Sequence, residues 1–173
     1  MMKFLPVRAD LKNNLFENVQ YLPFVIDLLF KNKKLIADDY FPQEDGELLD
    51  FLIEEINSVY PWFIVGIKDG EPLGAAWLTH WHKAGENKYH SCQIQACIDK
   101  KFWGKSSLFA ISRLLKFLTE STGVKRVQTE IPEFNQRAVA YMQRAGFEKE
   151  GIIRCAAFKN GKPLNNILMS IIL

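Results

Sequence analysis

The sequence contains few cysteines, no long apolar segment and almost no net charge. Its three cysteines, Cys92, Cys97 and Cys155, form no Cys-x-x-Cys pair, which predicts free thiols in a reducing compartment and hence a cytoplasmic protein. No apolar run approaches the ~20 residues of a membrane-spanning helix, and residues 1–8 lack the apolar core and cleavage site of a signal peptide. With 22 basic and 20 acidic residues, we expect neither a nucleic acid nor a membrane as partner.

Two common phosphate-binding motifs are missing as well. Gly104-Lys105-Ser106 lacks the earlier glycine that a Gly-x-x-x-x-Gly-Lys-Ser/Thr loop requires, and no Gly-x-Gly-x-x-Gly run occurs. Both absences disfavour a nucleotide-binding protein. The chain has no internal repeat, low-complexity tract or linker, so its 173 residues are expected to form one domain, residues 1–173, with a substantial core.

The spacing of apolar residues predicts a mixture of helices and strands. Pro23 is expected to break or kink the first helix, Gly123 to end the third, and Asn160-Gly161 to form a hairpin turn. This order predicts an α/β (α+β) fold with a mixed, mostly antiparallel central sheet, a parallel strand pair and helices on both faces. The predicted helices are 15–30, 47–57, 107–122 and 136–145, and the strands are 3–8, 62–68, 73–81, 90–98, 124–131, 147–158 and 164–173.

A glycine loop precedes the amphipathic helix predicted at 107–122. It reads Lys101-Phe102-Trp103-Gly104-Lys105-Ser106-Ser107. The amides at a helix N-terminus attract anions, and a glycine there lets the backbone approach a ligand. Lysines in the loop add positive charge. The segment therefore predicts a site for a phosphate or pyrophosphate; the alternative is an ordinary strand-to-helix turn with solvated lysines.

Two segments together resemble a known family. Lys101-x-x-Gly104-x-Ser106 resembles the Arg/Gln-x-x-Gly-x-Gly/Ala motif of the GNAT (Gcn5-related N-acetyltransferase) superfamily, and residues 135–147 resemble its Asn-x-x-Ala/Ser…Gly-Phe segment. Residues 146–154, followed by Asn160-Gly161, are similar to the ribosomal-protein N-acetyltransferase branch. The resemblance implies a GNAT (acyl-CoA N-acyltransferase) fold with a splayed parallel strand pair. It also implies an enzyme that transfers acetyl from acetyl-CoA to a primary amine by direct attack in a ternary complex.

The resemblance also implies which residues bind the cofactor. Amides from Gly104 to Ser107 would hold the pyrophosphate, the strand end would pair with the pantetheine arm, and Asn135 would reach the cofactor from the last helix. Asn135 has an alternative role as a helix N-cap. Ser106 stands where the family has a small Gly or Ala beside the phosphate. The predicted cofactor residues are Cys97, Ile98, Lys101, Phe102, Trp103, Gly104, Lys105, Ser106, Ser107, Asn135 and Met142.

The general base is not where the family often places it. Many members carry a Glu on the strand before the glycine loop, but residues 91–98 contain no acid. His90 is the nearest titratable group, and an imidazole near neutrality suits a base. Glu130, at the end of the next strand, is the second candidate. Each residue has a structural alternative as a polar side chain at a strand end.

The tyrosine that is the general acid in many family members is also missing from its usual position. Many members have a Tyr four residues before the Gly of Gly-Phe, a position that Met142 occupies here. Tyr141 lies one residue earlier, and one helical step turns a side chain by about 100°. Tyr141 is kept as the catalytic candidate, with core packing as its alternative. The ribosomal-protein branch often lacks this Tyr, so its displacement does not exclude activity.

Three histidines and a cysteine invite comparison with a metal site. If a hairpin centres near Glu86, His82 faces His90 and His80 faces Cys92, which suits zinc. That register is assumed, and a slip of one residue destroys it. We therefore predict no metal and read this hairpin as a border of the acceptor site, with aromatic residues Trp77, Trp81 and Tyr89.

The sequence leaves the acceptor and the oligomeric state open. The acceptor amine belongs to a protein N-terminus, a polyamine, an amino acid or a small antibiotic. The apolar strands near the C-terminus are compatible with a homodimer. The alternative function is a catalytically weak or inactive GNAT-like binding or structural module, because fold alone does not guarantee activity.

Overall fold

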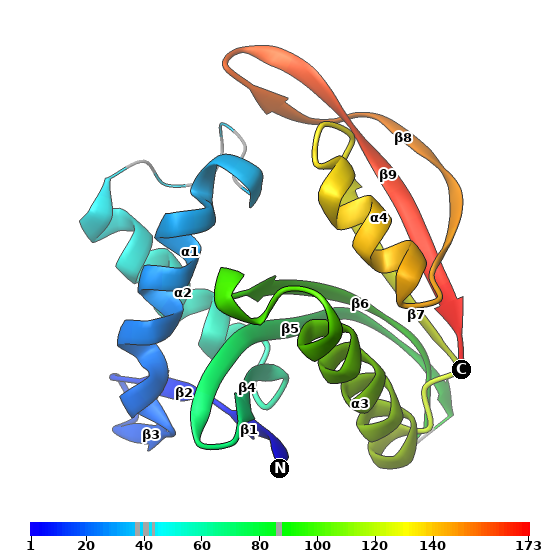
Figure 1. Cartoon of the computed structure of the whole chain (residues 1–173). Coiled ribbons are helices and arrows are strands. Elements are labelled where there is room, and N and C mark those ends of the chain that lie inside the picture. The colour runs from blue at the N-terminus through cyan, green and yellow to red at the C-terminus, as the bar shows by residue number, and fades with distance from the viewer. Residues whose placement is uncertain (37–38, 40–41, 43, 86–87) are drawn as a thin grey trace. The chain divides into compact units, whose positions relative to one another are not determined.

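The computed structural model describes residues 1–36, 39, 42, 44–85 and 88–173. Seven strands hydrogen-bond in the order β1-β4-β5-β6-β7-β9-β8, and β2 pairs separately with β3 (Figure 1). The chain divides into two compact units, residues 1–78 with 96–103 and residues 79–95 with 104–173. No helix of the described residues is both long and apolar enough to cross a lipid bilayer.

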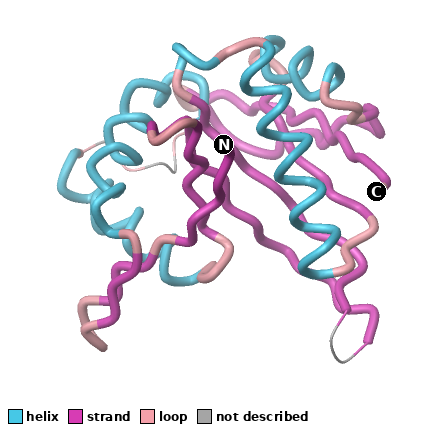
Figure 2. The backbone as a smooth tube through the Cα atoms, turned by 60° about the horizontal axis from the view of Figure 1, so that its bottom comes forward, coloured by secondary structure: helices cyan, strands magenta, loops and turns pink. Residues whose placement is uncertain are grey.

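The first unit combines antiparallel strands with two helices. β1 (Met2–Pro6) pairs with β4 (Phe63–Lys68), which pairs with the first part of β5 (Glu71–Gly85). Figure 2 shows β2 (Arg8–Asp10) and β3 (Leu15–Glu17) as a small separate hairpin. Apolar side chains from α1 (Leu22–Ile36), α2 (Asp45–Ser58) and β4 form one core, which includes Val25, Leu29, Leu48, Ile56, Phe63 and Val65.

The prediction of a helix over 15–30 was wrong at its start. Residues 15–17 form strand β3, and α1 begins only at Leu22. Pro23 therefore lies in the first turn of α1 instead of breaking a helix. Proline fits there because its fixed φ is already helical and its missing N–H would have no partner within the first turn.

The second unit contains the parallel strand pair. The first part of β6 (Lys88–Ile98) pairs in parallel with β7 (Arg126–Pro132), and α3 (Lys105–Thr122) connects them. After β7 come α4 (Gln136–Arg144), β8 (Glu148–Lys159) and β9 (Lys162–Ile172). β9 lies between β7 and β8 and is antiparallel to both. The expected mixed, mostly antiparallel sheet with a parallel pair is confirmed; the expectation of a single domain stays a prediction.

Two turn predictions of the second unit are confirmed. Gly123 ends α3 at φ 70°, and its N–H donates to the Thr119 carbonyl at 2.9 Å. Asn160 and Gly161, between β8 and β9, have φ values of 53° and 70°. Both positions need the left-handed region, which glycine and asparagine enter most readily.

The parallel strands separate after three residue pairs. Their ladder runs from Ser91 opposite Arg126 to Gln93 opposite Gln128, although both strands continue. β7 stays paired with β9 along its whole length, up to Pro132. The opening therefore lies on the β6 side of β7, as the resemblance implied.

A charged network ties the three C-terminal strands together. Arg126 on β7 forms a bidentate pair with Glu150 on β8, with Nη2 2.7 Å from Oε2 and Nη1 in contact with Oε1. Nη1 also donates to the Ser170 hydroxyl on β9 at 2.7 Å, and that hydroxyl donates to Glu150. Hydrogen bonds from Arg126 and Ser170 lower the Glu150 pKa from 4.5 to about 2.

We expect Glu150→Gln to lower the free energy of unfolding most clearly above the ordinary pKa of a glutamate. A carboxyl whose pKa is depressed by folding stabilises the native state above its unfolded pKa, and this contribution disappears as pH falls towards its folded pKa. The difference between wild type and variant should therefore shrink from pH ~4.5 to pH ~2. Urea unfolding at several pH values measures it, and a difference independent of pH would contradict this account.

Candidate functional site

Gly104 directly precedes α3 in the second unit. Its φ of 99° and ψ of −132° suit glycine, while a Cβ placed there would meet nothing within 4 Å. Glycine is therefore needed for backbone conformation, not for space. Gly104, the N-cap residue, has no side chain to cap the helix, and the first turn has no acidic residue. Because the first amides of a helix have no acceptor within it, this end suits an anionic ligand.

Two hydrogen bonds fix the first turn of α3, one within the turn itself and one from α4. The buried Ser107 hydroxyl donates to the Gly104 carbonyl at 2.9 Å, and the Tyr141 hydroxyl on α4 donates to the Ser107 carbonyl at 2.8 Å. Burial raises the Tyr141 pKa to about 12, so the phenol stays protonated near neutrality. Tyr141 thus joins the start of α3 to α4, and its role as a catalytic acid stays a prediction.

Asn135 and Met142 also have structural roles in α4. The Asn135 side chain accepts a hydrogen bond from the Ala138 N–H at 3.2 Å, which confirms its alternative role as N-cap. The Met142 side chain is buried. Their predicted contacts with a cofactor stay predictions.

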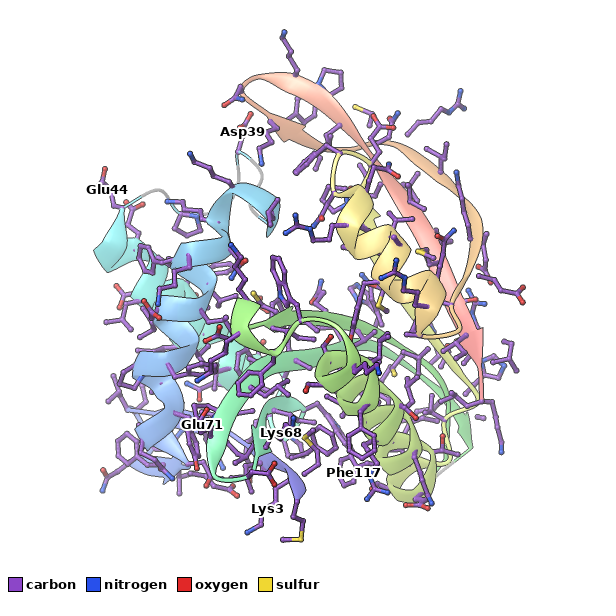
Figure 3. All side chains as sticks on the ribbon, viewed as in Figure 1. Lys3, Asp39, Glu44, Lys68, Glu71 and Phe117 are labelled. Atoms are coloured by element: carbon purple, nitrogen blue, oxygen red, sulfur yellow. The ribbon has the colours of Figure 1, made fainter. Side chains whose placement is uncertain are left out.

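The loop residues before Gly104 belong to the first unit. The Lys101 ammonium lies 3.1 Å from the Glu71 carboxylate and 4.9 Å from the centre of the Phe102 ring. The Lys68 ammonium lies 6.0 Å from the same ring, and Figure 3 labels Lys68 and Glu71, which pair across the β4–β5 turn. Lys101 is therefore held by β5. Its predicted contact with a cofactor has to compete with this ion pair.

At the end of β6, the backbone groups of some residues face β5 and those of others face away from it. The Asp99 N–H donates to the Leu73 carbonyl on β5 at 2.9 Å. Because backbone groups alternate along a strand, those of Cys97 also face β5, while those of Ala96 and Ile98 face away. The Ile98 carbonyl accepts from the Trp103 indole at 3.0 Å. Sequence reasoning overlooked Ala96, which is exposed although it lies within the strand.

The Cys97 side chain lies in the core of the first unit. Its thiol contacts the Leu28 carbonyl at 3.9 Å, and burial raises its pKa to about 12. Cys92 is also buried, with its pKa raised to about 12 by burial, while Cys155 is exposed. All three are free thiols, as predicted. The buried thiols are poor nucleophiles because they stay protonated near neutrality.

The two candidate bases lie at opposite ends of the parallel ladder. His90 precedes its first pair, and the His90 carbonyl accepts from the Lys125 N–H at 3.0 Å. Glu130 follows the last pair, where the strands have separated. At about 3.3 Å per residue, the two positions are roughly 16 Å apart along the strands. Only Glu130 lies in the open part of the pair.

Asn166 on β9 lies beside Glu130. Its Nδ2 is 3.4 Å from Glu130 Oε2, and its buried Oδ1 has no hydrogen-bond partner among the described residues. The orientation of the Asn166 amide is assigned from its contact with Glu130, because only the amide nitrogen can donate a hydrogen bond to the carboxylate. Asn166 was missed by sequence reasoning. Two adjacent asparagines, Asn165-Asn166, inside a mostly apolar closing strand were the available signal.

The metal alternative finds no support in the part of the chain that the structure describes. No three His, Cys, Asp or Glu side chains gather there in a way that could hold a metal ion. His80, His82 and His90 are exposed, whereas Cys92 is buried. Glu86, the assumed centre of the hairpin, lies outside the described residues. The rings of Trp81 and Tyr89 are 4.7 Å apart between centroids, so these aromatics do lie together.

Comparisons with known proteins match this chain to one family. Residues 27–148 match the family model described as "Acetyltransferase (GNAT) domain". The [ribosomal protein uS5]-alanine N-acetyltransferase of Escherichia coli is 21% identical over 121 residues, which are 69% of this chain and 62% of that protein. The chain therefore spans less than two thirds of this curated relative.

Two solved structures share the fold. A Salmonella typhimurium acetyltransferase that modifies the N-terminal serine of ribosomal protein L7/L12 aligns with TM-score 0.76 and 16% identity, covering 99% of this chain and 95% of that one. A spermidine N-acetyltransferase from Vibrio cholerae, in complex with CoA and spermine, aligns with TM-score 0.71 and 18% identity over the same shares.

The family match covers more than half of the chain, so the protein belongs to the GNAT acetyltransferase family. The curated relative and the solved structures include enzymes that act on ribosomal proteins, in line with the resemblance seen in the sequence.

We expect Tyr141→Phe to lower the free energy of unfolding by about 1 kcal/mol, since it removes one net hydrogen bond to the Ser107 carbonyl. Tyr89→Phe is the control, because it keeps the ring that packs on Trp81. Urea unfolding of both variants measures the difference. Equal stability of the two variants would mean that the Tyr141 bond contributes nothing.

Proposed function

We propose that this protein transfers the acetyl group of acetyl-CoA to a primary amine by direct attack in a ternary complex. The observation that carries the proposal is the separation of β6 and β7 after Gln93 and Gln128. An extended ligand can take the place of the missing strand pairing, because backbone amides and carbonyls along such an opening can bond to it. The family match makes acetyl-CoA the ligand that best fits this opening.

Each unit, taken by itself, offers groups that match a part of acetyl-CoA. In the second unit the start of α3, where Gly104 has no side chain to cap the helix, suits the pyrophosphate together with Lys105. The backbone of Ala96 and the Ile98 N–H suit the amides of the pantetheine arm, since they face away from β5. Cys97 faces β5 and is the weaker choice for this role.

Glu130 is the residue we assign as general base. The amine nitrogen attacks the thioester carbonyl carbon, a C–N bond forms, and the C–S bond breaks as the thiolate of CoA leaves. The nitrogen gives up one proton, which Glu130 accepts directly or through a water, and the thiolate leaves as such or takes a proton from solvent. Asn166 donates to Glu130 and so orients its carboxylate.

The acceptor is a primary amine whose carrier stays open. The relatives act on the N-termini of ribosomal proteins or on spermidine, by their names. Glu130 next to Asn166 suits an amine that arrives as a cation, since the carboxylate attracts it. The ammonium loses one proton to solvent before the attack, and the nitrogen loses the second to Glu130 as the amide forms. A cytoplasmic location and a homodimer also stay predictions.

Acetyl-CoA should raise the midpoint of thermal unfolding of the wild type in a concentration-dependent way, because a ligand of the native state stabilises it. Lys105→Glu should remove most of this rise, because it places a negative charge where the pyrophosphate would bind. The same change favours the helix itself, since acids stabilise helix N-termini. Arg113→Glu, the same charge reversal on an exposed residue farther along α3, is the matched control and should keep the rise. Wild type without any rise at millimolar acetyl-CoA would favour the inactive-module alternative.

Glu130→Gln should lower kcat by roughly a hundredfold to ten-thousandfold, the usual contribution of a general base, while acetyl-CoA still shifts the unfolding midpoint. His90→Gln should leave kcat close to that of the wild type. Thiol release with any amine that the wild type acetylates measures both variants. If His90→Gln loses activity and Glu130→Gln does not, the base has been assigned to the wrong end of the ladder.

A further inference from the structure

Gly74 on β5 lies in close contact with the backbone at the end of β6. A Cβ built on Gly74 would lie 2.5 Å from the Cys97 carbonyl oxygen and 3.0 Å from the Ile98 Cα. Both neighbours are backbone atoms, which cannot turn aside as a flexible side chain can. Any other residue at this position would push the two strands apart, because a packed interior has no room for the added carbon.

Gly66 on the neighbouring strand offers a direct comparison. It lies opposite Gly74 in the β4–β5 register. A Cβ on Gly66 would lie 3.8 Å from the Phe4 ring and 3.9 Å from both the Gly74 carbonyl oxygen and the Leu73 side chain, which are ordinary contact distances. Both glycines have backbone conformations that other residues adopt. The requirement for glycine at position 74 therefore comes from its approach to β6 and not from its own dihedral angles.

A series of contacts continues from this point to the glycine loop. Asp99 is bonded to β5 through its N–H and the Leu73 carbonyl, and its carboxylate accepts from the Lys101 N–H at 3.0 Å. The Trp103 indole then bonds to the Ile98 carbonyl. The close approach of β5 and β6 at Gly74 thus fixes the position of the C-terminal end of β6. It also fixes the direction in which the backbone groups of Ala96 and Ile98 point.

We propose that Gly74 is a positioning residue for the acyl donor: by lacking a Cβ, it fixes the end of β6 so that the backbone of Ala96 and the Ile98 N–H can bond to the arm of acetyl-CoA. Gly74 itself faces Cys97 and touches no reacting atom. This inference rests on the proposed function, since it assumes that acetyl-CoA binds along β6.

The test compares Gly74→Ala with Gly66→Ala in binding titrations. Two probes are used: acetyl-CoA, and the phosphorylated adenosine diphosphate half of coenzyme A without its arm. Gly74→Ala should weaken acetyl-CoA binding roughly tenfold or more, because overpacking displaces the strand end. Binding of the nucleotide half should stay as in wild type, since the start of α3 holds it. Gly66→Ala should change neither. A general loss of structure would weaken both probes together.

Other results have distinct meanings. Wild-type protein that binds neither probe contradicts the proposed function, and this inference with it. Wild-type protein that binds both, with Gly74→Ala binding acetyl-CoA equally well, overturns the role of Gly74 alone and leaves the proposed function standing. Equal weakening of both probes by a folded Gly74→Ala also overturns it, since the effect would not be specific to the arm.

If Gly74→Ala does not fold, amide hydrogen exchange of the wild type tests whether acetyl-CoA bonds to the end of β6, on which the role of Gly74 depends. Acetyl-CoA should slow exchange at Ala96 and Ile98, whose N–H groups face away from β5. The Asp99 amide should be protected already without ligand, because it is bonded to Leu73. Exchange at Ala96 and Ile98 that acetyl-CoA leaves unchanged would overturn the proposal.

Discussion

The short parallel ladder between β6 and β7 is the constraint on which the site of the second unit depends. Three residue pairs hold the strands together, and β7 then follows β9 instead of β6. Antiparallel pairing with β9 continues to Pro132, so the sheet does not simply end at the opening. In the proposed function, backbone groups that would have completed the parallel ladder bond to acetyl-CoA; Glu130 lies on β7 beyond the last pair.

Hydrogen bonds distinguish the candidate side chains more clearly than their positions in the sequence do. Tyr141 and Ser107 use their hydroxyl groups to fix α3 and α4, and burial keeps the phenol protonated. Asn135 caps α4. Glu130 has a longer contact with Asn166, at 3.4 Å. The first three side chains thus stabilise α3 and α4, while the carboxylate that we propose for proton transfer contacts Asn166 on β9.

Local features of the chain were predicted well because they depend on neighbouring residues. The positive φ values at Gly123, Asn160 and Gly161 follow from residue type, and α3 follows from its apolar stripe. The helix expected over 15–30 was misjudged because its apolar spacing fits two conformations. Residues 15–17 pair with β2 in a short hairpin, and apolar periodicity alone does not reveal this pairing. Pro23 was then read as a breaker, although the first turn of a helix accepts it.

The sequence by itself determined the family, the order of most elements and the glycine loop, since these follow from residue types at fixed spacing along the chain. Tertiary structure decided which side chains meet. It placed His90 and Glu130 at opposite ends of one ladder, brought Asn166 beside Glu130, and turned the backbone of Ala96 away from β5. It also gave Gly74 its tight contact with Cys97. Such relations depend on strand register and on the distance between strands, which residue spacing along a single chain does not contain.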